Sequence, residues 1–335
     1  MKQPQLTFFC ELESDALEAL FAEPSVINDL AALEARVSLG LLDLSPARAA
    51  VVRRLNEAGI PVVAWLLLPK EEGYWFNLSN APQAAARYAG FKAWTAEHGL
   101  EWAGLGIDVE PDIREMQQLL DDWPRLLRTL LQRTFDNERL RRAQAAYGAL
   151  VDRMRDDGYP VEGYAFPFVV DERRAGATLL QRLAGTVEVP VDREVLMLYT
   201  SFLRAAGPGV LWSYGPDAGS VGVGSTGGGV EIEGIDPLPT LDWDAFSRDL
   251  RLARRRSDDV HVFSLEGCVR QGFLSRLKAF DWDRTVTPPL ETAGQVEKAR
   301  RALRAVLWAS AHPAVVLGGL IGALWLLSRL RPTRR

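Results

Sequence analysis

Three carboxylates follow one another in the segment "AGLGIDVEPD", at Asp108, Glu110 and Asp112. The apolar residues 104–107 before them predict a buried strand, so the acids lie where this strand ends. Because side chains alternate along a strand, Asp108 and Glu110 point to the same side. Two adjacent carboxyl groups resist ionising together, so Glu110 is expected to hold a proton near neutral pH. A general acid that protonates a glycosidic oxygen needs this property.

Few other residues offer catalytic chemistry. The chain has three histidines without zinc-like spacing and two cysteines, Cys10 and Cys268, which make neither a metal site nor a disulfide framework. The formal net charge is −5, and the arginines are dispersed along helical stretches, which argues against a nucleic-acid partner. We therefore expect the acids to carry the chemistry, with no cofactor and no bound metal. Whether the two cysteines bond to each other stays open.

Short apolar runs alternate with helical patterns along most of the chain, which predicts a mostly parallel sheet. Eight such strands with intervening helices fit one (β/α)8 barrel over residues 1–283, in which an active site lies at the carboxyl ends of the strands. An open doubly wound sheet is the alternative, but no glycine-rich phosphate turn follows the first strand. The expected strands are 5–12, 35–44, 60–69, 102–111, 161–170, 195–202, 219–225 and 260–267.

The segment "AGLGIDVE" resembles the D-G-x-D-x-D-x-E signature on the fourth strand of family 18 glycoside hydrolases, the chitinase-like barrels. Gly104, Asp108 and Glu110 match this signature, while Ala103 and Gly106 replace its first two acids. The resemblance implies a TIM barrel that hydrolyses a polysaccharide containing N-acetylhexosamine. It further implies that Glu110 protonates the leaving group while Asp108 orients an N-acetyl group that attacks the anomeric carbon.

A second motif, "MLYT" at residues 197–200, resembles the M-x-Y-D of the same family on strand six. The resemblance implies that Tyr199 contacts the acetamido group of the substrate, while Thr200 replaces the aspartate. The missing acids favour a second interpretation, a carbohydrate-binding or scaffolding barrel without catalysis. A third interpretation is a phosphodiesterase barrel with Glu11, Asp108 and Glu110 as ligands of Mg²⁺ or Ca²⁺, which the lack of histidines near strand ends disfavours.

Other residues at predicted strand ends and loops are candidates for substrate binding. Glu266 lies on predicted strand eight, where the family usually has a tryptophan, and strand eight neighbours strand one in a closed barrel. Glu266 and Glu11 could thus supply a second carboxylate, or simply cap loops. The aromatic loops could form sugar platforms or fold down on themselves. The substrate-binding candidates are Glu11, Tyr74, Trp75, Asn77, Trp212, Tyr214 and Glu266.

The C-terminal part of the chain has a different composition. Residues 305–328 are uncharged and would extend about 35 Å as a helix, enough to cross a hydrocarbon core of about 30 Å. We therefore expect a single-pass transmembrane helix here, with a buried helix that closes the domain as the alternative. Residues 284–304 are expected to form a linker and a charged juxtamembrane helix, and residues 329–335 a basic tail. Basic residues on both sides of the span leave its orientation open.

Overall fold

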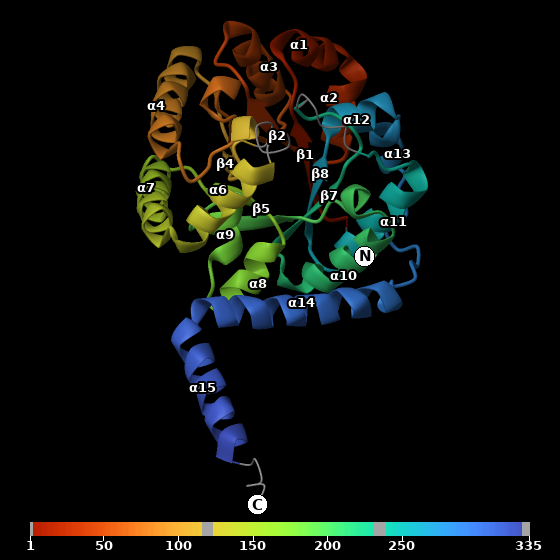
Figure 1. The fold of residues 1–335 in the computed structure, drawn as a ribbon. Coiled ribbons are helices and arrows are strands. Elements are labelled where there is room, and N and C mark those ends of the chain that lie inside the picture. Colours follow the sequence, from red (N-terminus) through yellow and green to blue (C-terminus); the bar gives the residue numbers. More distant parts are fainter. Residues whose placement is uncertain (1–2, 116–122, 231–238, 330–335) are drawn as a thin grey trace, which may run out of the picture.

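The computed structural model describes residues 3–115, 123–230 and 239–329. Its centre is a closed barrel of eight parallel strands, each paired with the next in the sequence and β8 paired with β1 (Figure 1). This confirms the predicted (β/α)8 architecture. The strands are β1 (Gln5–Cys10), β2 (Arg36–Leu41), β3 (Val62–Leu66), β4 (Gly104–Asp108), β5 (Val161–Ala165), β6 (Arg193–Met197), β7 (Ser220–Gly224) and β8 (Asp259–Phe263).

The strands read as nearly continuous apolar runs because both of their faces are buried. Rings from β1, β3 and β5 meet inside the barrel: the ring centroid of Phe9 lies 5.4 Å from that of Trp65 and 4.7 Å from that of Tyr164. These strands are not neighbours in the sheet, so their side chains can touch only across the interior. The other face of the sheet packs against the helices, which form the larger apolar core.

Helices surround the barrel (Figure 1). Pro24 divides the helical region expected after strand one into two helices, and α10 fills the connection between β6 and β7, where the sequence shows no clear helix. The helices of the barrel are α1 (Ser14–Ala22), α2 (Pro24–Ala32), α3 (Pro46–Glu57), α4 (Ala81–His98), α6 (Trp123–Phe135), α7 (Asn137–Asp156), α8 (Phe168–Ala175), α9 (Leu179–Ala184), α10 (Gly207–Tyr214), α11 (Trp243–Arg254), α12 (Leu265–Arg270) and α13 (Phe273–Leu277).

Three short 3₁₀ helices occur in the connections of the described chain: η1 (Lys70–Glu72), η2 (Thr200–Ala206) and η3 (Gly215–Asp217). Several helix starts have the capping that their sequence predicts. The Ser45 side chain, for example, accepts a hydrogen bond from the Arg48 amide at the start of α3, where Pro46 occupies the first turn. These local signals explain why many predicted helix boundaries lie within a few residues of the observed ones.

The C-terminal segment differs from the single straight span expected over residues 305–328. Helix α14 (Leu290–Ala311) packs against α8 and α10, and α15 (Pro313–Arg329) projects away from the barrel (Figure 1). The helix ends before Pro313, which lacks the amide hydrogen that would continue α14. Residues 305–311 therefore belong to a helix of the barrel, and residues 290–304 are not a free juxtamembrane segment.

The length and hydropathy of the C-terminal helices bear on the predicted membrane span. Among the described residues, no single helix is both long enough and apolar enough to cross a membrane. Leu290–Ala311 and Pro313–Ala323 meet the criteria of length and composition only as a pair, with a bend of 95° between them.

Candidate active site

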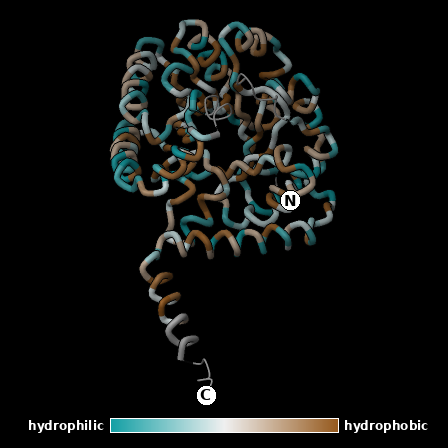
Figure 2. Tube along the Cα trace, in the orientation of Figure 1, coloured by the Kyte–Doolittle hydropathy of each residue, from teal (hydrophilic) through white to brown (hydrophobic). Residues whose placement is uncertain are grey.

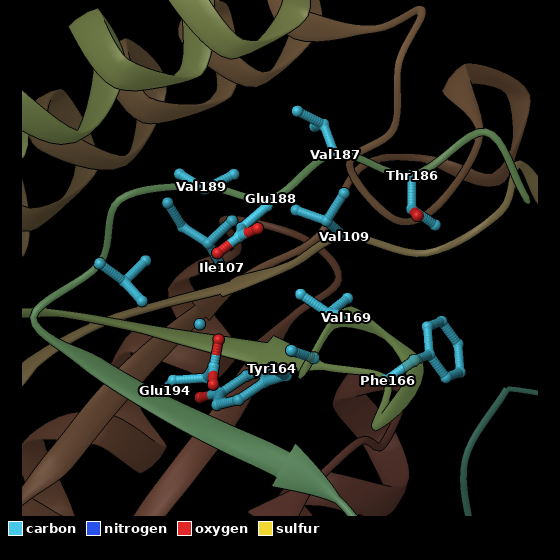
Figure 3. Close-up of a pocket in the computed structure, with 13 residues that line it drawn as sticks. Ile107, Val109, Tyr164, Phe166, Val169, Thr186, Val187, Glu188, Val189 and Glu194 are labelled. Atoms are coloured by element: carbon cyan, nitrogen blue, oxygen red, sulfur yellow. The ribbon is translucent and has the colours of Figure 1, made fainter. Parts of the chain in front are cut away.

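Asp108 and Glu110 lie at the carboxyl end of β4, on the inner side of the barrel. Ile107 and Val109 point the opposite way, into a pocket between the sheet and residues 186–191 (Figure 3). Because side chains alternate, Asp108 must face the interior, where its neighbour across the β4–β5 pair is Tyr164. This pocket is lined mainly by apolar side chains and lies on the face of the sheet opposite to Asp108 and Glu110, so it is not part of the candidate site.

The loop after β3 holds the end of β4 in place. The Phe76 amide donates a hydrogen bond to the Asp108 carbonyl over 3.1 Å, and the Glu110 amide donates one to the Phe76 carbonyl over 3.0 Å. These bonds form a parallel bridge between Phe76 and Val109 that continues the sheet beyond the last residue of β4. The backbone of Glu110 is therefore fixed although this residue follows the strand.

The two acids influence each other strongly. Asp108 is 2% exposed, and burial followed by repulsion from Glu110 and Glu11 raises its pKa well above the usual value. Burial also raises the pKa of Glu110 to about 7, although interaction with Asp108 lowers it. The pair thus keeps at least one proton near neutral pH. Asp108 is the more deeply buried of the two acids, whereas Glu110 is half-buried.

Glu11 is the third carboxylate of this group. It follows β1, is 7% exposed, and accepts a hydrogen bond from the Tyr74 hydroxyl. Burial raises its pKa to about 8, with repulsion from Glu266 and Glu110 acting in the same direction and the Tyr74 hydrogen bond acting against it. The sequence places Glu11 and Tyr74 in separate segments, so it offers no signal for this contact.

Tyr199 lies at the end of β6, where the family resemblance places it. Burial raises the pKa of its hydroxyl, and the next largest contributions come from Asp108 and Glu110. Its ring centroid lies 5.6 Å from that of Phe263 at the end of β8. The structure therefore brings Tyr199, Asp108, Glu110 and Glu11 together at one end of the barrel.

Gly106 and Thr200 stand where the family motifs have acids, and the structure shows the surroundings of both. A side chain at Gly106 would collide with Tyr164, whose ring carbon Cζ lies 2.9 Å from the position of an added Cβ. The tyrosine of β5 thus occupies the space of one missing acid. Thr200 is buried and donates a hydrogen bond to Asp249 of α11, so it is directed toward the helix layer.

Glu266 lies in the first turn of α12, not on β8 as expected, and it is 8% exposed. Burial raises its pKa, and neither of its side-chain oxygens has a hydrogen-bond partner of good geometry among the described residues. The glycine-rich turn after β7 covers it: a side chain at Gly228 would collide with Glu266, and one at Gly229 would lie 3.4 Å from Glu11 Oε2. Both glycines have positive φ, of 91° and 92°.

The aromatic loop after β3 folds down onto the barrel. Tyr74 and Trp75 are buried, with ring centroids 5.1 Å apart in an edge-to-face contact. Asn77 is also buried, and its side-chain oxygen accepts a hydrogen bond from the Ser79 amide. The loop therefore supplies Tyr74 to Glu11, but it does not present an exposed aromatic platform.

Trp212 and Tyr214, two of the candidates for substrate binding, contact other helices. Both lie in α10 within the helix layer, where the guanidinium carbon of Arg256 lies 3.5 Å from the ring centroid of Trp212. The Tyr214 hydroxyl donates a hydrogen bond to Asp171 of α8 over 2.6 Å. These aromatic residues therefore pack α10 against neighbouring parts of the helix layer.

The cysteines and the possible metal-ligating residues are the remaining groups that could do chemistry. Cys10 and Cys268 are both buried and free, so they form no disulfide. Within the described ranges, no group of three or more histidine, cysteine, aspartate or glutamate residues has an arrangement that could hold a metal ion.

Comparisons with known proteins bear on the fold. No protein-family model matches the sequence, and no curated protein matches it. A GH18 chitinase from Pseudoalteromonas aurantia superposes with a TM-score of 0.50 at 9% sequence identity, over 83% of this chain and all of that one. This likeness is one of fold, a TIM barrel like that of the chitinase. The PgaB (BpsB) glycoside hydrolase domain from Bordetella bronchiseptica gives a TM-score of 0.48 at 10% identity, over 85% and 100% of the two chains.

At this low identity, the likeness describes a divergent GH18-like TIM barrel and says nothing by itself about turnover. The structural comparison nevertheless agrees with the two motif resemblances, which fall on strands four and six of the barrel. In this chain, Asp108 ends β4, Glu110 follows it, and Tyr199 follows β6.

Proposed function

We propose that this GH18-like barrel hydrolyses a polysaccharide and that Glu110 is the general acid. The observation that carries the proposal is the Asp108–Glu110 pair at the end of β4, in which the pKa of Glu110 lies at about 7. An acid with this pKa is protonated in a useful fraction of molecules near neutral pH, and it still donates its proton readily. The substrate class that fits the motifs is a polysaccharide with N-acetylhexosamine units.

In this mechanism, Glu110 protonates the glycosidic oxygen while the bond from this oxygen to the anomeric carbon breaks. The acetamido oxygen of the same sugar attacks the anomeric carbon, which gives a cyclic intermediate. Asp108, one layer deeper, orients the acetamido nitrogen, and the Tyr199 hydroxyl donates a hydrogen bond to the acetamido group. Water then opens the cyclic intermediate, and its proton returns to Glu110. This is the substrate-assisted exception to catalysis by two carboxylates.

The variant Glu110→Gln tests the assignment. It keeps the shape of the side chain but has no proton to donate, so hydrolysis of N-acetylated oligosaccharides should fall by at least about a hundredfold. Glu101→Gln is the matched control, because Glu101 is exposed and precedes β4 outside the site. Circular dichroism of both variants checks that the barrel is folded. Full turnover in Glu110→Gln would contradict the proposal.

A second function, carbohydrate binding without catalysis, is favoured by the filling of the Gly106 position by Tyr164 and by the orientation of Thr200 toward α11. Binding without catalysis would use the same site as hydrolysis, but it would release no product. Binding of N-acetylated oligosaccharides by the wild-type chain, measured calorimetrically and with no product detected by chromatography, would select this function over hydrolysis.

We further propose that the C-terminal segment anchors the protein to a membrane. The support is the uncharged run at 305–328 together with the exposed apolar side chains of α15. The full chain should sediment with membranes and resist extraction by high salt. Leu320→Glu should increase the soluble fraction, whereas Leu203→Glu, a similarly exposed position in η2, should leave it unchanged. A wholly soluble wild-type chain would contradict the anchor.

A further inference from the structure

Helix α14 is locked onto the barrel by a buried ionic cluster. The Arg300 side chain is 3% exposed, and its nitrogens lie 3.2 Å from Asp171 Oδ1 and 2.8 Å from Asp217 Oδ2. Arg304 also contacts Asp171 Oδ1, over 2.9 Å. Asp171 is completely buried in α8, and Asp217 lies in η3 after α10. The direction of α14 relative to the barrel is therefore determined by the fold.

Charges on α14 are separated between its two sides. The one acid after Gln295, Glu297, faces the barrel, where its carboxylate lies 3.2 Å from Arg304 and 3.3 Å from the Ser213 hydroxyl. Lys298 and Arg301 are exposed on the opposite side. They are accompanied there by small apolar side chains, Ala302 and Ala305. Between Gln295 and the end of α14, the outward face thus carries the cations Lys298 and Arg301, while the one acid of this stretch, Glu297, has a side chain that is 43% exposed and is paired with Arg304.

Helix α15 leaves α14 at a bend of 95°, and hydrophobic residues follow one another in its first turns (Figure 2). Val315, Leu317, Leu320 and Ile321 are 55–67% exposed. At about 100° per residue, Leu317, Leu320 and Ile321 fall within one arc of about 100°, whereas Val315 points to a different side of the helix. A partner protein with one groove would cover only a stripe of them, whereas a lipid environment covers all of them.

The corner between the two helices has the composition of a membrane interface. Trp308, in the last turn of α14, is 45% exposed and stacks on His312, with ring centroids 4.8 Å apart. Tryptophan is enriched at the level of the lipid headgroups. Helix α15 has 17 residues and so extends about 25 Å, which is close to the thickness of a hydrocarbon core.

We propose that α14 lies flat on the surface of a bilayer that contains anionic lipids, while α15 enters the hydrocarbon core. Lys298 and Arg301 then contact the headgroups, and Trp308 lies at the interface. Because the ionic cluster holds α14 on α8 and α10, the side of the barrel formed by β5 and β6 with these helices faces the membrane. This inference rests on the proposed membrane anchor and adds the orientation of the barrel and the charge of the lipid.

The test uses the full chain in phosphatidylcholine vesicles with or without phosphatidylserine, with a fluorophore on an introduced cysteine. Ala305→Cys reports on the outward face of α14, Leu320→Cys reports on α15, and Ala86→Cys, exposed on α4, is the control. Cys10 and Cys268 are buried and should not react in the folded protein. We expect headgroup spin labels to quench position 305 and acyl-chain spin labels to quench position 320, with position 86 unaffected.

The charge of the lipid is tested with the double variant Lys298→Glu, Arg301→Glu. Its affinity for vesicles with phosphatidylserine should fall by about tenfold or more, because each basic residue near an anionic surface contributes to binding. Affinity for vesicles of phosphatidylcholine alone should change little. Equal affinity of the variant and the wild type for the anionic vesicles would overturn the role of the two cations.

The remaining outcomes separate this inference from the anchor itself. Quenching at position 320 without quenching at position 305 would leave the anchor in place and overturn the flat orientation of α14. Absence of quenching at both positions would overturn both proposals. The fluorophore at position 320 could also be shielded from water but quenched by no spin-labelled lipid, in a protein of doubled mass. This result would show that a second copy covers α15, and it would overturn the lipid assignment.

Discussion

The Tyr74 hydroxyl donates a hydrogen bond to Glu11 Oε1, which joins the loop after β3 to the end of β1. Both side chains are buried beside Asp108 and Glu110. Burial, together with repulsion from Glu266 and Glu110, raises the pKa of Glu11 to about 8. The repulsion is stronger than it would be in water, because the site is shielded from solvent. The end of the barrel is thus a group of acids that share protons near neutral pH.

Replacing Glu11 with glutamine should change how stability depends on pH. The unfolded chain loses this proton near pH 4.5 and the folded protein near pH 8, so Glu11 favours folding at low pH, and this contribution falls as the pH rises between the two values. The loss is about 1.4 kcal/mol per pH unit. Glu11→Gln should therefore lose less unfolding free energy than the wild type between pH 5 and 8. Parallel curves in urea titrations of the two proteins would contradict the raised pKa.

Hydrolysis by the wild-type protein should decline as the pH rises through about 7, because Glu110 then loses the proton that it donates. On the alkaline side, kcat/KM should fall about tenfold per pH unit. The measurement is the initial rate with soluble N-acetylated oligosaccharides from pH 5 to pH 9. Returning each sample to pH 6 should restore the rate, which distinguishes titration from unfolding. A rate that stays level from pH 6 to pH 9 would rule out this assignment of the acid.

A side chain at position 106 should destabilise the barrel. Gly106→Ala forces a methyl group against the Tyr164 ring in the crowded interior, and overpacking of this kind costs about 1–3 kcal/mol. Gly148→Ala is the control, because nothing lies within 4 Å of its added Cβ and alanine stabilises a helix interior by about 0.5–1 kcal/mol. Chemical denaturation of both variants should give shifts of opposite sign. Equal stability of Gly106→Ala and wild type would show that Tyr164 moves aside.

Removing the buried cation of α14 should destabilise the whole barrel. Arg300→Met leaves Asp171 without its main buried partner, and such losses cost about 3–5 kcal/mol. The neighbouring Arg301 is exposed, so Arg301→Met should change the unfolding free energy by less than about 0.5 kcal/mol. The measurement is urea unfolding followed by circular dichroism. Similar effects of the two variants would mean that α14 does not contribute to the barrel in the way its contacts indicate.

Much of the fold could be predicted from the sequence because strand burial is a local property. Each strand of a closed parallel barrel is covered on both faces, so it appears as a short apolar run whatever its neighbours are. The position of Asp108 and Glu110 follows from the same pattern, since a strand that ends in acids must present them at its carboxyl end. Alternation along β4 then predicts that both acids face the interior.

Contacts between distant segments were decided by the tertiary structure. The burial of Tyr214 depends on α14, which packs against α10 from about 80 residues further along the chain and places Arg300 over the Tyr214 ring. The sequence of α14 resembles a juxtamembrane helix because it is rich in basic residues and does not reveal which of them are buried. Only the fold shows that Arg300 is buried against Asp171, whereas Lys298 and Arg301 remain exposed.

The sequence by itself determined the barrel, the strand-end acids and the apolar character of the C-terminal run, because each depends on residues close together in the chain. The tertiary structure alone decided which acids share a site, that Tyr74 contacts Glu11, that Tyr164 fills the space beside Gly106, and that the C-terminal run bends before Pro313. The physical reason is that loop paths and helix packing place side chains tens of residues apart in contact, and no local periodicity encodes those distances.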